Sequence, residues 1–136
     1  PAFSAYLGTN QSIAGSTWTK ITCGTEEFDT ANAYDSATNY RFQPTVAGYY
    51  QLSGAGYMGG QTSQCVSLWK NGTEVKRGNQ TATGGGYQIM TIVSALVYLN
   101  GSTDYVELYG YQSSGSQTIG SGNSATYFQA FLARAA

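Results

Sequence analysis

Apolar and polar residues alternate along most of this chain in short segments, as they do in strands that bury one face. Residues 48–58 and 64–70 follow this period of two, and clusters of Gly, Asn-Gly and Ser/Thr separate such segments about every ten residues. No helical or heptad period is sustained, and no internal repeat is found. The pattern predicts an all-β sandwich or barrel. The expected strands are residues 2–8, 17–23, 40–43, 48–58, 64–70, 73–77, 87–99, 103–112 and 125–134.

Two Asn-Gly pairs mark tight turns in this strand pattern. Asn71-Gly72 and Asn100-Gly101 supply the positive φ angles of a two-residue hairpin, so both are predicted to be hairpins. Because successive antiparallel strands place their connections at alternating ends, the short and long connections should separate. The short ones (46–47, 71–72 and 100–102) are expected at one end, and the long ones (59–63, 78–86 and 113–124), here named the crown loops, at the other.

The segment 87–99 is apolar on both faces. One face holds Ile89, Val93 and Val97, and the other holds Ile92, Leu96 and Tyr98. An antiparallel strand normally leaves one face to water, so this segment indicates burial against another subunit; cover by the chain's own loops or a bent second sheet is the alternative. The sequence does not decide which face is the subunit contact. The predicted interface residues are Tyr50, Leu52, Ile89, Ile92, Val93, Tyr105, Tyr109 and Phe131.

Composition narrows the function classes. The 136 residues fit one domain, residues 1–136, and six Lys and Arg against seven Asp and Glu give a net charge of −1. Such a surface does not attract nucleic acid. No apolar run approaches the roughly 20 residues of a membrane helix, and the start lacks the features of a signal peptide, so membrane insertion is not expected. Because the chain opens directly in strand-like sequence, we expect it to be the C-terminal tip of a longer fibrous protein.

Candidate catalytic and metal groups are scarce. The chain has no histidine, which excludes a Ser-His-Asp triad and the usual structural zinc sites. Cys23 and Cys65 are expected to be free, although a disulfide stays open because sequence does not give their Cα separation. The acidic residues between Glu26 and Asp35 could supply a glycosidase pair, but carboxylates in such loops more often stabilise turns. We expect no enzyme activity and no cofactor.

One stretch matches a known family. Asp29, Tyr34, Phe42 and the run Gly48-Tyr49-Tyr50-Gln51-Leu52 resemble the C1q signature. Cys23 stands in place of its first Phe, Leu52 in place of its second, Gly54 in place of its final aromatic, and one extra residue separates Tyr34 from Phe42. Further agreement comes from AFSAYL, SLWKNGTEV, YVELYGYQ and TYFQAFLAR, so the resemblance spans nearly the whole chain. The amino-acid sequence is more similar to bacterial and bacteriophage members of this family than to animal ones.

The resemblance implies a C1q/TNF-like jelly-roll β-sandwich of about ten antiparallel strands, packed as a tight homotrimer at the end of a collagenous or fibrous stalk. It implies binding and not catalysis, and it makes Cys23 a small buried hydrophobe. Some animal members hold calcium with loop carboxylates. The crown loops of this chain contain no Asp or Glu, so no metal site is expected.

The crown loops are the predicted ligand site. Their amides and hydroxyls could pair with sugar hydroxyls, and loops on a rigid scaffold commonly carry function; the alternative is that they only keep the loops soluble. The candidate ligand-binding residues are Gln61, Thr62, Asn79, Gln80, Thr81, Thr83, Ser116, Gln117, Thr118 and Asn123.

The resulting hypothesis is a homotrimeric attachment module of a phage or bacterial fibre tip that recognises a host-surface protein or glycan, on a virion or outside the cell. The first alternative is a structural trimerisation or capsid-decoration knob without a ligand of its own. The second is a secreted factor of the animal C1q type.

Overall fold

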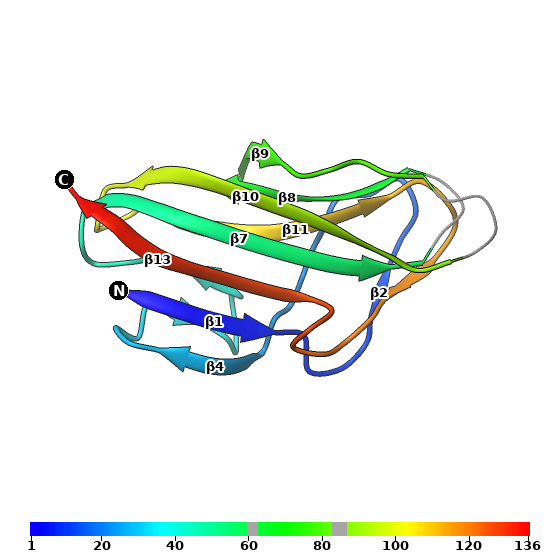
Figure 1. Ribbon diagram of the computed structural model, residues 1–136, viewed down its shortest axis with the longest axis horizontal. Coiled ribbons are helices and arrows are strands. Elements are labelled where there is room, and N and C mark those ends of the chain that lie inside the picture. Colours follow the sequence, from blue (N-terminus) through cyan, green and yellow to red (C-terminus); the bar gives the residue numbers. More distant parts are fainter. Residues whose placement is uncertain (60–62, 83–86) are drawn as a thin grey trace.

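The computed structural model describes residues 1–59, 63–82 and 87–136, which form two antiparallel β-sheets packed face to face (Figure 1). No helix occurs among these residues, and therefore none that could span a membrane. The strands are β1 (Ala2–Tyr6), β2 (Gln11–Ile13), β3 (Thr19–Lys20), β4 (Thr25–Asp29), β5 (Tyr34–Asp35), β6 (Arg41–Phe42), β7 (Gly48–Met58), β8 (Gln64–Lys70), β9 (Thr73–Arg77), β10 (Ile89–Leu99), β11 (Val106–Gln112), β12 (Gln117–Ile119) and β13 (Tyr127–Ala135).

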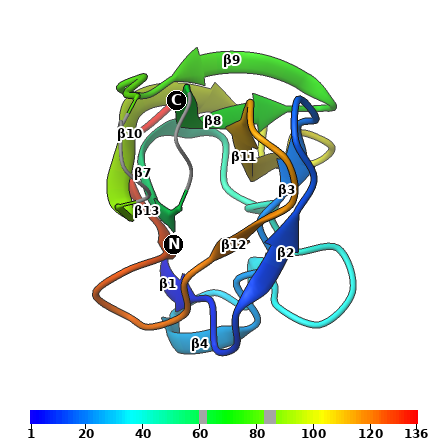
Figure 2. The ribbon, with the colours of Figure 1, turned by 90° about the vertical axis from the view of Figure 1, so that its right-hand side faces the viewer.

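The first sheet is built around β7, which pairs with β10 on one side and with β13 on the other; β1 and β4 continue beyond β13, and β12 and β2 join at one end of β7. The second sheet has the order β5-β6-β11-β8-β9, with β3 also on β11. Figure 2 shows the two layers end on. The predicted bounds of β7, β8 and β9 agree with the structure. Strands β2, β4, β5 and β12 lie in segments predicted as loops. Strands β2, β5 and β12 have only two or three residues, too few for an alternation to stand out, and β4 has the sequence Thr-Glu-Glu-Phe-Asp, which does not alternate.

Aromatic side chains fill the space between the sheets. Phe3 stacks on Tyr34 at 4.4 Å and on Phe42 at 4.8 Å between ring centroids, and meets the edge of Phe128 at 5.1 Å. These rings come from both sheets and are buried. Such stacked and edge-on pairs add to the free energy of burying each ring, so this cluster ties the two layers together.

The departures from the C1q signature have physical explanations. Cys23 and Leu52 are fully buried, so each acts as a smaller hydrophobic residue in a core position. At Gly54 a β-carbon would lie 2.4 Å from Leu108 Cδ1, which leaves no room for an aromatic side chain there. The core of this chain is therefore packed around smaller residues at these positions.

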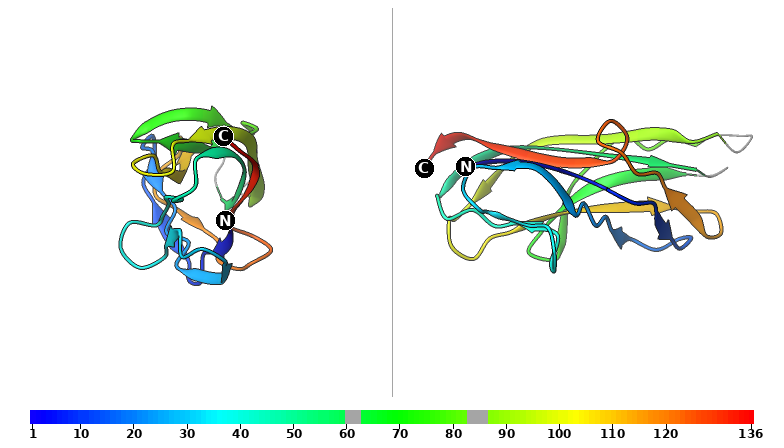
Figure 3. Two further views of the ribbon diagram at one scale, coloured as in Figure 1. Left: turned by 90° about the vertical axis from the view of Figure 1, so that its left-hand side faces the viewer. Right: turned by 90° about the horizontal axis from the view of Figure 1, so that it is seen from below.

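The short connections meet at one end of the sandwich, here named the turn end, where both termini also lie (Figures 1 and 3). Asn71-Gly72 is the predicted hairpin, with φ angles of 51° and 79°. The hairpin prediction for Asn100-Gly101 is wrong, because β10 and β11 belong to different sheets. The Asn100 side chain instead accepts hydrogen bonds from the backbone N–H groups of residues 102–104, which turns the chain from one sheet to the other.

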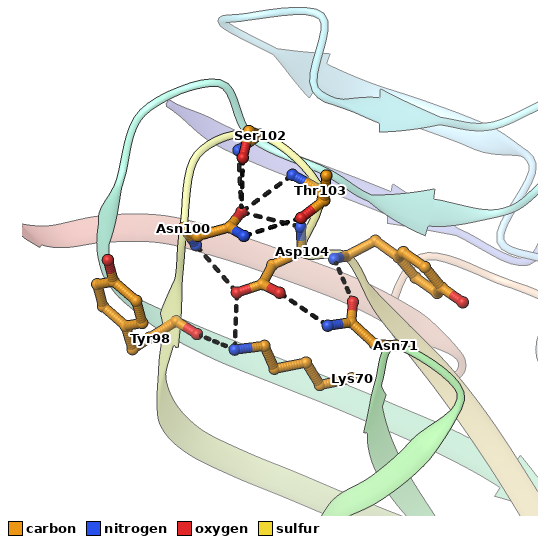
Figure 4. Close-up of polar contacts among 8 residues, drawn as sticks. Lys70, Asn71, Tyr98, Asn100, Ser102, Thr103 and Asp104 are labelled. Carbon is orange, nitrogen blue, oxygen red and sulfur yellow. Dashed lines mark hydrogen bonds and ion pairs between the residues drawn. The ribbon is translucent and has the colours of Figure 1, made fainter.

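Asp104 holds this end together (Figure 4). Its carboxylate accepts hydrogen bonds from Asn71 Nδ2 at 2.7 Å and from the Asn100 backbone N–H at 3.0 Å, and it pairs with Lys70 Nζ at 2.8 Å. Lys70 also donates to the Tyr98 carbonyl at 2.8 Å. The hydrogen bonds from Lys70 and Asn71 lower the pKa of Asp104. These contacts, here named the Asp104 clamp, connect two sheets through one buried carboxylate.

Candidate functional site

The strand with two apolar faces has one face inside and one outside. Val93, Val97 and Leu99 on β10 point into the core and are buried. On the opposite face Ile92 is 46% exposed and Leu96 53% exposed. The face with Ile92 and Leu96 is therefore the one that β10 leaves exposed.

The exposed residues of β10 belong to a wider apolar surface. In the pairing register Leu96 lies beside Gln51 of β7, and Phe131 of β13 lies on the other side of Gln51. We name the outward side of β10, β7, β13, β1 and β4 the apolar sheet face. Its large exposed side chains are Phe28, Tyr49, Ile92, Leu96, Tyr98 and Phe131.

A polar row crosses the middle of this face. Ser94, Ser53 and Gln129 lie side by side on neighbouring strands, and Gln51 Nε2 donates to Ser94 Oγ at 2.8 Å. Strands β7 and β10 carry no charged residue over their whole length. The part of the face on β7 and β10, which has aromatic and aliphatic groups and no charges, has the composition of the buried centre of a protein interface. A shallow cavity of about 180 Å³ lies on it, lined by Ala2, Phe3, Phe28, Gln51, Ser53, Gln129, Ala130 and Phe131.

The predicted interface residues fall into four places. Ile92 and Phe131 lie on the apolar sheet face. Tyr50, Leu52 and Val93 are at most 2% exposed, so they belong to the chain's own core and offer no surface to a partner. Ile89 shares the inward face of β10 and is partly exposed at its end. Tyr109 lies on β11 of the second sheet and Tyr105 directly before that strand, so both lie outside this surface.

The outer face of the second sheet carries an aromatic cluster that sequence reasoning missed. Trp69 stacks on Tyr109 with ring centroids 4.5 Å apart, and Trp18 contacts both Trp69 and Tyr111. The Arg77 guanidinium lies 5.1 Å from the Trp18 ring centroid. These rings lie on three separate segments, so no local pattern could have grouped them.

The described residues of the crown loops up to β12 lie at the end opposite the short connections, as predicted, whereas the segment after β12 turns back toward the end of β1 (Figure 1). Thr81 exchanges two backbone hydrogen bonds with Gln64, and Gln80 Nε2 donates to Ser63 Oγ. Asn79 Oδ1 accepts a hydrogen bond from the Ile92 backbone N–H at 2.6 Å, which covers part of the free edge of β10. These contacts stabilise the crown loops, so three of the predicted ligand residues also have a structural role: Asn79, Gln80 and Thr81.

The remaining candidate ligand residues separate further. Gln117 and Thr118 lie in β12, and Ser116 and Thr118 are exposed. Asn123 lies apart, because the backbone N–H of its neighbour Gly122 donates to Leu7 and so ties this loop to the connection after β1. Three predicted ligand residues lie outside the described residues: Gln61, Thr62 and Thr83.

Neither thiol is poised for chemistry. Cys23 and Cys65 are free and buried, as predicted. Burial raises the pKa of the Cys23 thiol to about 12 and also raises the pKa of the Cys65 thiol, so both stay protonated near neutral pH. In the described part of the chain no group of three acidic or Cys residues has the geometry to hold a metal ion.

The acidic residues of the 26–35 segment stabilise turns. Asp29 accepts hydrogen bonds from the backbone N–H groups of Ala31 and Tyr34. Asp35 accepts from the backbone of residues 37–39, and the hydrogen bonds from Thr38 and Asn39 lower its pKa to about 2. Glu26 accepts from the Ser36 hydroxyl. These contacts agree with the interpretation of the segment as a set of turn-stabilising carboxylates.

Solved structures share this fold at low sequence identity. The globular domain of zebrafish complement 1qA protein covers 100% of this chain, which covers 99% of that chain, with a TM-score of 0.72 and 15% identity. Eiger TNF from S. frugiperda gives a TM-score of 0.77 at 8% identity, covering 99% of this chain and 93% of that chain. Murine APRIL at pH 5.0 gives 0.70 at 10% identity, covering 97% and 99%.

These matches establish the C1q/TNF-like jelly roll as the fold of this chain, and the predicted fold class is confirmed. No protein-family model matches the chain, and no curated protein matches its sequence.

Proposed function

Starting from a C1q/TNF-like jelly roll, we propose that this domain is a non-enzymatic binding module that works as a homotrimer. The apolar sheet face is the observation that carries the proposal. Six large apolar side chains lie exposed on one face of one sheet, whereas monomeric proteins rarely leave such a patch to water. A second copy of the chain is the partner that the C1q resemblance implies, and the absence of charges on β7 and β10 favours close packing there.

The crown loops are the proposed ligand site. They join strands of both sheets and lie opposite Pro1, so a stalk entering at Pro1 would leave them at the far tip (Figures 1 and 3). Their exposed groups are hydroxyls and amides, which suit a neutral glycan or a protein surface. Three copies of a weak site on one trimer bind a multivalent surface far more tightly than one copy does. We propose attachment of a phage or bacterial fibre tip to a host surface, on a virion or outside the cell.

Mass in solution tests the homotrimer. Light scattering after gel filtration should give three times the monomer mass of 14.4 kDa. Leu96→Lys places a charge on the apolar sheet face and should yield monomers. Val75→Lys is the matched control, because Val75 is an exposed apolar residue on β9 of the other sheet, and its trimer should persist. A wild-type monomer at micromolar concentration would contradict the proposal.

Binding to host cells or glycan arrays tests the crown site. The triple variant with Ala at Gln80, Gln117 and Thr118 should lose binding while its mass stays that of the wild type. Unchanged binding of this variant would contradict the proposal that the crown loops form the ligand site. If the wild-type domain bound neither cells nor glycans and fibres failed to assemble without it, the structural knob would be the better account.

A further inference from the structure

A polar groove of about 510 Å³ lies where edge strand β4 of the first sheet meets β5 and β6 of the second. It is separate from the crown loops and from the exposed side chains of the apolar sheet face. The segment between β4 and β7 stands out from the sandwich there, as the cyan loop of Figure 2. The volume is within the range of small-molecule sites, about 300–1,000 Å³. The groove is lined by Glu26, Asn32, Ala33, Tyr34, Asp35, Ser36, Ala37, Arg41, Gln43, Thr45 and Ser102.

Arg41 is a cation in this groove that has no acidic partner among the described residues. Its guanidinium lies 4.4 Å from the ring centroid of Tyr105, which orients the planar fork. Asp35 is its cross-strand neighbour, but the Asp35 carboxylate turns back onto its own turn and accepts from Asn39 Nδ2 at 2.7 Å. The ion pairs found across the described chain do not include Arg41. A fixed set of donors therefore faces the groove.

Hydrogen-bond acceptors lie around the same space. Gln43 Nε2 donates to the Ser102 carbonyl at 3.0 Å, which leaves Gln43 Oε1 as an acceptor. Glu26 Oε1 accepts a hydrogen bond from the Ser36 hydroxyl, and Glu26 Oε2 can accept one from a ligand. Asn32 adds an exposed amide at a φ of 50°, a left-handed conformation that Asn tolerates.

Donors and acceptors in one groove suit hydroxyl groups, because each hydroxyl both donates and accepts. The charges narrow the choice further. Glu26 and Asp35 outnumber Arg41 and so disfavour an anionic ligand, while Arg41 needs a hydrogen-bond acceptor, which an ammonium group does not offer. We propose that this groove binds a neutral saccharide, with Arg41 donating to sugar oxygens and with Glu26 and Gln43 accepting from sugar hydroxyls. This site depends neither on the crown loops nor on the homotrimer.

Amide and guanidinium resonances of ¹⁵N-labelled protein test the proposal directly. Lactose and maltose serve as neutral probes at millimolar concentration, with sialyllactose as the anionic and glucosamine as the cationic comparison. The neutral sugars should shift the side-chain signals of Asn32, Arg41 and Gln43, and more strongly than either charged sugar does. Shifts confined to the crown loops, or no shift with either neutral sugar, would overturn the groove assignment.

Two variants and one control separate the site from general folding. Arg41→Gln should weaken binding at least about tenfold, the effect of losing a charge-assisted hydrogen bond. Asn32→Gly keeps the positive φ and removes the amide, so it should weaken binding a few-fold.

Arg77→Gln is the control for both, because Arg77 also lies over an aromatic ring on the second sheet but lies outside the groove. Equal losses in Arg41→Gln and Arg77→Gln would contradict the proposal. Tighter binding of sialyllactose or glucosamine than of lactose and maltose would refute the neutral class.

Discussion

Replacing Asp104 should destabilise the turn end more than any other single change of a polar residue there. Asp104→Ala removes the acceptor of Asn71 Nδ2 and of the Asn100 backbone N–H, and it breaks the ion pair with Lys70. The Asp104 and Lys70 side chains are only 12% and 23% exposed, so water replaces these contacts poorly. Hydrogen bonds to charged groups contribute about 1.5–3 kcal/mol each and are not additive. In the variant Lys70 keeps its hydrogen bond to the Tyr98 carbonyl, so its charge is not left without a partner. We therefore expect a loss of about 3 kcal/mol in the free energy of unfolding.

The pH dependence of this loss gives a second, independent check. The pKa of Asp104 is lowered in the folded state, so its stabilising contribution is present above the pKa of the unfolded chain, about 3.9, and is lost as pH falls through the folded-state pKa. The difference between wild type and Asp104→Ala should therefore be largest near neutral pH and shrink in acid.

Urea denaturation at one fixed protein concentration measures both effects. A fixed concentration is needed because self-association would add to the apparent stability. Asp104→Asn is the matched control: it keeps the shape and one acceptor but loses the charge, so its loss should be intermediate. A loss below about 1 kcal/mol for Asp104→Ala, within the range of ordinary surface changes, would refute the assignment of the clamp. So would a loss that stays the same from neutral to acidic pH.

Two further predictions concern the core. Gly54→Ala should lower the free energy of unfolding by about 1–3 kcal/mol, because the new methyl group would clash with Leu108 Cδ1 at 2.4 Å, whereas Gly115→Ala, which meets no atom within 4 Å, should change it little; equal effects in urea denaturation would contradict this packing. The thiols of Cys23 and Cys65 should react with a colorimetric thiol reagent only after denaturation, because both are buried and protonated; rapid labelling of the native protein would show that the core opens readily.

The sequence identified β10 as a strand of the candidate interface, but not which of its two faces is exposed. Strand β10 is apolar on both faces, so a period of two identifies a strand and gives no direction. Val93 is inside and Ile92 outside only because the second sheet packs against one of the two faces. The sequence therefore led to an interface set that mixed core residues such as Tyr50 with surface residues such as Phe131.

The polar groove was beyond the reach of sequence reasoning. Arg41 meets Tyr105 across 64 positions of the chain, and Gln43 reaches Ser102. The acidic residues nearby were recognised as turn-stabilising groups, and the structure agrees. Their place beside an unpaired guanidinium depends on the pairing of β5 with β6 and of β6 with β11, which no local pattern contains.

By itself the sequence determined the features that depend on neighbouring residues. Alternation placed β7, β8 and β9 at their observed bounds, Asn71-Gly72 formed its hairpin because those residues accept positive φ angles, and the resemblance to the C1q signature implied the jelly roll. Only the tertiary structure decided which face of β10 meets the core, why Asn100-Gly101 crosses between sheets, and where Arg41 lies. These depend on which strands pair and which sheets pack together, and both are set by the burial of side chains far apart in the chain.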